Sequence, residues 1–147
     1  MLNSILVGTL LTIVTVAIHA SGTTQWIQHL TRRAKAIREE QSRWSPTVIL
    51  GSTATVLLLL HILEVAVWAL AYLALVDSIR DLEQATYFST VTFSSLGYGD
   101  IVIQGPWRLL SAIEAMTGLL IFGWSTALLF AVVQRIWNLP PQKPTDE

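Results

Sequence analysis

Three long apolar stretches dominate the chain, and polar segments separate them. The stretches cover residues 1–20, 46–76 and 106–138. A helix of 20 residues is about 30 Å long, which equals the hydrocarbon thickness of a bilayer. Each stretch can therefore cross a membrane as a helix, and the two longer ones can cross at a tilt. The pattern predicts an all-α membrane protein with three transmembrane helices per chain.

The polar segment at residues 21–45 is rich in positive charge. Its apolar residues recur on one helical face, which is typical of an amphipathic helix on a membrane surface, although a solvated linker helix has the same pattern. Thr23 or Thr24 is the expected N-cap of this helix. The segment contains five of the nine basic residues: Arg32, Arg33, Lys35, Arg38 and Arg43.

This charge predicts the orientation of the chain. Basic loops stay in the cytoplasm by the positive-inside rule, so residues 21–45 are expected there. The N-terminus and the loop between the second and third stretches then lie outside, and the C-terminus is cytoplasmic. We expect a multi-pass protein of the cell membrane, with a prokaryotic inner membrane as its location.

A short helix and a glycine-rich segment separate the second and third stretches. Ser45-Pro46 starts the second stretch with a cap and a proline, and Pro106 opens the third. Asp81 with Gln84 resembles a capping box at the start of a helix over residues 82–94, which at about 20 Å is too short to span. The segment that follows reads Ser-Leu-Gly-Tyr-Gly-Asp. Irregular backbone survives at membrane depth only when it is buried in protein or lines a wet cavity.

Residues 95–100, SLGYGD, resemble the selectivity filter of potassium channels, which usually reads TVGYGD. The resemblance extends from about Ala85 to Gln134 and covers the pore helix, the filter and the inner helix of the two-transmembrane type. Ser95 replaces the usual Thr and keeps its hydroxyl, and Leu96 replaces Val, of which the family uses only the carbonyl.

The resemblance implies a re-entrant pore helix followed by a filter that coordinates K⁺ through backbone carbonyls. Ser95 would add its hydroxyl, and the Asp100 residues of the assembled copies would form a ring at the outer mouth. The expected carbonyl ligands are those of Ser95, Leu96, Gly97, Tyr98 and Gly99.

One filter per chain and no internal repeat predict a homotetramer, because potassium filters use four loops. The expected function is passive, K⁺-selective conduction across the bilayer. A weakly selective cation channel and a non-conducting membrane adaptor are the alternatives. We expect neither an enzyme nor a cofactor other than the permeant K⁺.

Composition agrees with a membrane protein. Of 147 residues, 52% are hydrophobic and only 13% charged, with a mean hydropathy of +0.55, whereas soluble domains have about 25% charged residues. The net charge of −1 gives no reason to expect a nucleic-acid partner, and the lack of cysteine excludes disulfides and thiolate metal sites.

The expected organisation has four parts. An N-terminal transmembrane helix (1–20) is followed by the basic cytoplasmic amphipathic linker (21–45). The pore module (46–138) contains the outer helix (46–76), pore helix (82–94), filter (95–100) and inner helix (106–138). A short cytoplasmic tail (139–147) ends the chain, and no cytosolic ligand-binding domain is expected on it.

Three ionisable residues, His61, Glu64 and Glu114, lie inside apolar stretches. Such residues are rare in membrane spans and usually face protein or water. A metal site of the His-x-x-Glu type, as in a membrane hydrolase, lacks an evident third ligand. A protonation sensor behind the filter is a second interpretation. Buried polar contacts that fix the helices to the Ser/Thr-rich pore helix are the favoured one.

The last stretch contains candidate hinge and gate residues. Gly118 and Gly123 mark either a bend or close helix packing. Thr126, Phe130 and Gln134 are four residues apart and form one stripe along the helix. Four Phe130 rings near a pore axis could close it by dewetting, whereas the alternative places Phe130 against lipid.

Overall fold

The computed structural model describes residues 1–40 and 45–137, with the side chains of residues 1–32 and 45–136. The described elements are all helical: α1 (Leu2–Glu40), α2 (Pro46–Leu75), α3 (Leu82–Phe93), the 3₁₀ turn η1 (Gly105–Trp107) and α4 (Arg108–Trp137). Three segments are long and apolar enough to cross a membrane, namely Leu2–Arg32, Pro46–Leu75 and Gly105–Ile136. The predicted all-helical architecture with three span-capable helices is confirmed.

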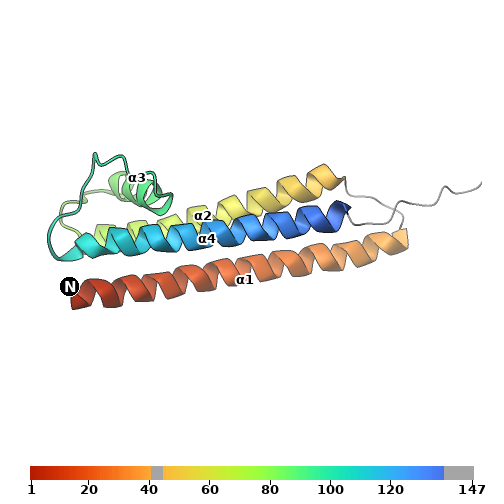
Figure 1. Ribbon diagram of the computed structural model, residues 1–147, viewed down its shortest axis with the longest axis horizontal. Coiled ribbons are helices and arrows are strands. Elements are labelled where there is room, and N and C mark those ends of the chain that lie inside the picture. Colours follow the sequence, from red (N-terminus) through yellow and green to blue (C-terminus); the bar gives the residue numbers. More distant parts are fainter. Residues whose placement is uncertain (41–44, 138–147) are drawn as a thin grey trace, which may run out of the picture.

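The three long helices run side by side, and α3 folds against one end of the bundle (Figure 1). Helix α1 runs away from the end where α3 lies, α2 runs back toward that end, and α4 runs away from it again (Figure 1). The Ser4 hydroxyl donates a hydrogen bond to the Pro106 carbonyl. The N-terminal end of α1 and the segment between α3 and α4 therefore share one end of the molecule.

The starts of α2 and α3 follow the local sequence signals. Pro46 occupies the first turn of α2, and the Ser45 carbonyl accepts from the backbone N–H groups of Val48 and Ile49, although its hydroxyl makes no cap bond. At α3, Asp81 Oδ1 accepts from the Gln84 N–H at 2.8 Å. The Gln84 side chain accepts in turn from the Arg80 N–H at 2.9 Å, one residue beyond the partner in a capping box.

Helix α1 differs from the expectation, because it continues without a break across residues 20–21. The predicted helix start at Thr23 or Thr24 is wrong. The Thr23 hydroxyl donates to the His19 carbonyl at 2.7 Å, so it bonds inside a helix that has already formed. Residues 41–44 of the expected linker and the expected tail at 139–147 lie outside the described residues.

The fully buried residues of α1 are small or polar, whereas the other helices bury both apolar and polar residues. In α1 the inward face is small or polar, and the outward face is apolar and exposed, for example at Leu6, Leu10 and Ile13. Without water to drive apolar contact, helices in lipid associate through small and polar residues. The buried small or polar residues of α1 are Ser4, Gly8, Thr15, His19 and Thr23.

Around α3 the core is aromatic and aliphatic. The Phe88 ring meets the Tyr72 ring edge-on, with centroids 4.9 Å apart. These contacts fix α3, and with it the segment that follows, against α2 and α4. The largest buried apolar side chains are Trp68, Tyr72, Phe88, Phe93, Leu110 and Ile121.

Candidate functional site

The SLGYGD segment begins directly where α3 ends, and α3 carbonyls hold its first residues. The Ser95 N–H donates to the Thr92 carbonyl at 2.9 Å. The N–H groups of Leu96 and Gly97 both donate to the Val91 carbonyl, at 3.0 and 3.2 Å. The position of the segment therefore follows from the position of α3.

Its backbone alternates in conformation. Ser95, Gly97 and Gly99 have φ values of 58°, 56° and 79°, whereas the intervening Leu96 and Tyr98 do not have positive φ. Residues with a Cβ rarely adopt such angles, and glycine adopts them freely. A Cβ at Gly97 or Gly99 would meet no atom within 4 Å in one chain, so conformation alone favours glycine there.

The other end of the segment is tied back to α3. The Tyr87 hydroxyl donates to Asp100 Oδ2 at 2.7 Å. This bond raises the pKa of Tyr87, because loss of the phenol proton would place a second negative charge beside the carboxylate. Residues 94–100 are exposed in a single chain, with Leu96 at 55% and Tyr98 at 68%.

Glu114 is fully buried and joins three helices. Its Oε2 accepts from the Tyr72 hydroxyl of α2 at 2.7 Å, and its Oε1 accepts from the Ser89 hydroxyl of α3 at 2.5 Å. Ser89 also lies 3.0 Å from the Val65 carbonyl. Glu114 thus connects α4 to the helix that carries the SLGYGD segment.

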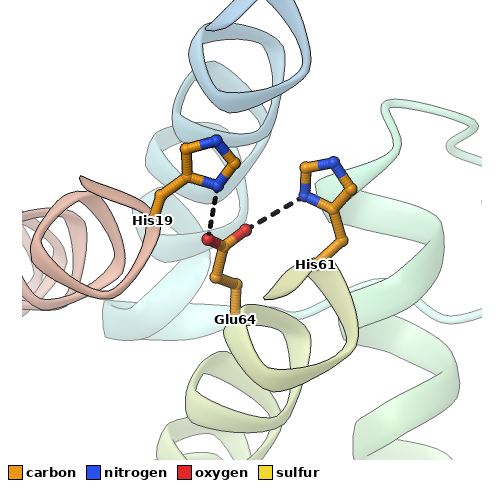
Figure 2. Close-up of side chains that lie close together, drawn as sticks. All are labelled: His19, His61 and Glu64. Carbon is orange, nitrogen blue, oxygen red and sulfur yellow. Dashed lines mark hydrogen bonds and ion pairs between the residues drawn. The ribbon is translucent and has the colours of Figure 1, made fainter. Parts of the chain in front are cut away.

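Glu64 lies in a second buried cluster, which connects to α1 rather than to α3. Its Oε1 lies 2.9 Å from His19 Nδ1, and its Oε2 lies 3.1 Å from His61 Nδ1 (Figure 2). The Nε2 atoms of the two histidines lie 3.4 and 3.2 Å from the Ser125 hydroxyl oxygen of α4. The four side chains form a closed ring of polar contacts, which we call the His–Glu–Ser ring.

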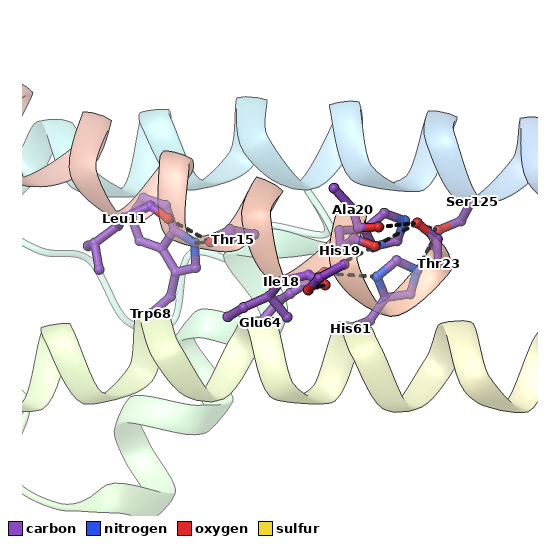
Figure 3. Close-up of polar contacts among 11 residues, drawn as sticks. Leu11, Thr15, Ile18, His19, Ala20, Thr23, His61, Glu64, Trp68 and Ser125 are labelled. Carbon is purple, nitrogen blue, oxygen red and sulfur yellow. Dashed lines mark hydrogen bonds and ion pairs between the residues drawn. The ribbon is translucent and has the colours of Figure 1, made fainter. Parts of the chain in front are cut away.

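His19 and Ser125 are the two members of this ring that the sequence did not single out. The spacing of His19 from Ser4, Gly8, Thr15 and Thr23 places it on the small and polar face of a helix, and this was an available signal. The same face carries a further bond, from Trp68 Nε1 to the Thr15 hydroxyl at 3.0 Å (Figure 3). Among the described side chains, no buried nitrogen or oxygen lacks a hydrogen-bond partner.

The hinge candidates lie in different surroundings within an unbroken α4. A Cβ on Gly118 would lie 1.9 Å from the Phe93 carbonyl oxygen at the end of α3, so this glycine permits close packing. A Cβ on Gly123 would meet nothing within 4 Å. Thr126, Phe130 and Gln134 are all exposed in one chain, with Phe130 at 62%.

Comparison with known proteins adds one match. A family model described as an ion channel matches residues 55–135, which is more than half of the chain. The match contains most of α2, all of α3, the SLGYGD segment and most of α4, whereas α1 precedes it. No curated protein and no solved structure matches the chain. The chain belongs to this ion channel family.

Proposed function

We propose that four copies of this chain form a K⁺-selective channel, with residues 95–99 of each copy supplying oxygen ligands around a shared axis. The alternating backbone of the segment is the observation that carries the proposal. Alternation of left-handed and ordinary residues turns successive peptide carbonyls toward one side of a strand. A row of carbonyls can replace the water shell of a dehydrated cation, as potassium filters do.

The surroundings of the segment support a cation. Helix α3 ends at Phe93, directly before the segment. The C-terminal end of a helix carries partial negative charge. Asp100 adds a carboxylate at the other end of the segment, where Tyr87 holds it.

Exposure of this segment in a single chain supports assembly. Lipid-exposed irregular backbone does not occur within the hydrocarbon region of a bilayer. In this proposal the neighbouring copies and a hydrated pore cover the segment. Exposed apolar side chains beside it would then contact those copies: Leu82, Tyr87, Leu96 and Tyr98.

Family membership suggests a protein that is not an enzyme, and three span-capable helices suggest a multi-pass membrane protein. The alternatives to a K⁺-selective channel are a weakly selective cation channel and a non-conducting adaptor whose pore module serves only assembly.

Ion flux into liposomes tests the proposal. The purified chain is reconstituted at known density, and uptake of K⁺ and Na⁺ is followed in separate assays, with protein-free liposomes as the control. We expect K⁺ uptake far above Na⁺ uptake. Equal uptake of both ions would favour the weakly selective channel, and no uptake of either would favour the adaptor.

A further inference from the structure

We propose that His19, His61 and Glu64 form a binding site for a transition metal ion of the Zn²⁺ class, with Ser125 as a shared hydrogen-bond acceptor behind the two histidines. The proposal concerns a site away from the SLGYGD segment. It does not depend on whether the protein conducts K⁺.

The three side chains offer a suitable ligand set at near-suitable spacing. Two imidazoles and a carboxylate bind Zn²⁺ with bonds of about 2.0–2.2 Å, so tetrahedral ligand atoms lie about 3.4 Å apart. Here the carboxylate oxygens lie 2.9 and 3.1 Å from the two Nδ1 atoms, and the ligand atoms all lie within 4.8 Å of one another. Both Nδ1 atoms point at the carboxylate (Figure 2), and an ion between them needs these nitrogen–oxygen distances to widen by a few tenths of an ångström, to about 3.4 Å.

Ser125 supplies the partner that metal-bound histidines require. A histidine that binds metal through Nδ1 carries its proton on Nε2, and such protons are donated to an outer partner. The Ser125 oxygen lies 3.4 Å from Nε2 of His19 and 3.2 Å from Nε2 of His61. A hydroxyl has two lone pairs but one proton, so it can accept from both rings yet donate to only one. In two neutral, metal-free rings that donate from Nδ1 to Glu64, both Nε2 atoms need a donor, and the Ser125 hydroxyl can serve only one of them. In two metal-bound rings both Nε2 atoms carry protons, and the same oxygen can accept from both.

Aromatic packing holds both rings in place. The two imidazoles are stacked with centroids 5.6 Å apart and planes 14° apart. Trp124 meets the His19 ring edge-on at 5.3 Å, and Phe122 lies 4.7 Å from the His61 ring. The ligand side chains of His19 and Glu64 are fully buried, whereas that of His61 is 12% exposed. An ion would enter past His61.

The site would connect α1 to the rest of the molecule. His19 belongs to α1, whereas His61 and Glu64 lie one turn apart on α2. A bound metal would replace the hydrogen bonds between these helices with coordinate bonds. Because a ligand that binds only the folded state stabilises it, metal binding should strengthen the docking of α1.

Metal titration of the purified protein, carrying a histidine-free affinity tag, tests the proposal. After chelator treatment, Co²⁺ is added and its visible absorption is recorded, followed by Zn²⁺ competition and metal analysis after desalting. We expect one ion per chain, a Co²⁺ spectrum of a nitrogen- and oxygen-ligated site, its displacement by Zn²⁺, and a Zn²⁺-dependent rise in melting temperature. No stoichiometric metal on the unmodified protein would overturn the proposal and leave a purely hydrogen-bonded ring.

Matched variants locate the ion. His19→Gln should abolish binding, and Ser125→Ala should weaken it by about tenfold or more, as loss of an outer-shell partner does. His29→Gln makes the same substitution at an exposed position of α1 and should bind like the unmodified chain. Equal binding by His19→Gln and His29→Gln would show that the metal lies elsewhere. If His19→Gln does not fold, the spectrum and stoichiometry of the unmodified protein still decide the question.

Discussion

At the residue scale, Gly118 shows how closely α4 approaches the end of α3. A methyl group there would lie 1.9 Å from the Phe93 carbonyl oxygen, and the atoms in its way are backbone that cannot swing aside. Sequence reasoning left a hinge and close packing as equal interpretations. The contact accounts for the glycine through packing, and α4 continues through this position without a break.

Gly118→Ala should therefore strain the packing of α4 against the end of α3. Overpacking of this kind costs about 1–3 kcal/mol, and here it would push the start of the SLGYGD segment out of place. The check is thermal unfolding of the purified protein in detergent, together with K⁺ flux. Gly51→Ala is the control, because a Cβ on that helical glycine meets nothing within 4 Å. An unchanged melting temperature and flux in Gly118→Ala would contradict the packing account.

Glu114 is the second residue whose surroundings give a definite expectation. In Glu114→Ala the Ser89 hydroxyl can still donate to the Val65 carbonyl, 3.0 Å away, but the buried Tyr72 hydroxyl loses its acceptor. An unsatisfied buried donor costs about 1–3 kcal/mol. We expect that loss of stability in Glu114→Ala, measured by thermal or denaturant unfolding. Glu114→Gln keeps an acceptor oxygen and should lose much less, whereas equal losses in the two variants would show that hydrogen bonding is not the cause.

At the element scale, local signals predicted the helices well. Pro46, Asp81 with Gln84, and Pro106 set the starts of α2, α3 and the η1–α4 unit to within two residues, because proline and capping side chains act within one turn. The glycines likewise indicated unusual backbone at positions 97 and 99. The positive φ of Ser95 was not predictable, because serine carries no preference for it.

The tertiary contacts of α1 were harder to predict, for a physical reason. Thr23 and Thr24 have the chemistry of helix caps, but α1 is already helical before them, so the Thr23 hydroxyl bonds to a carbonyl of its own helix. The pairing of His19 with Glu64 joins residues 45 apart on different helices. Such a pairing depends on which faces meet, and the local sequence does not specify that.

The exposed stripe on α4 leads to a prediction about gating. Phe130 is 62% exposed in one chain and shares its face with the polar residues Thr126 and Gln134. If this face lines the pore of an assembled channel, four Phe130 rings form an apolar constriction. Phe130→Ser should then raise open probability in single-channel recordings and leave ion selectivity unchanged. Leu129→Ser is the matched comparison, and a strong effect there with none at Phe130 would show that another face of α4 lines the pore.

At the scale of the whole molecule, the bundle predicts which parts of the chain share a side of the membrane. The start of α1 and the loop after α2 lie at the α3 end, and α2, which Ser45 precedes, starts at the other end (Figure 1). Because the chain has no cysteine, single cysteines can report sidedness. Asn3, Ser45 and Asp77 are exposed positions for them.

We expect Asn3→Cys and Asp77→Cys to react with a membrane-impermeant thiol reagent from outside intact cells. Ser45→Cys should react only after the membrane is opened, because the basic residues of α1 favour the cytoplasm. Labelling of Asn3→Cys and Asp77→Cys from opposite sides would contradict the bundle itself. The same grouping with the opposite sidedness would contradict only the assigned orientation.

In the proposed channel, residues 95–99 select K⁺ through their backbone carbonyls. The most direct measurement is the reversal potential of single channels in a planar bilayer, with K⁺ on one side and Na⁺ on the other. We expect a reversal potential close to the K⁺ equilibrium potential. In Gly99→Ala, whose Cβ opposes a φ of 79°, this selectivity or the current itself should collapse. A reversal potential near zero in the unmodified protein would show that residues 95–99 do not select K⁺.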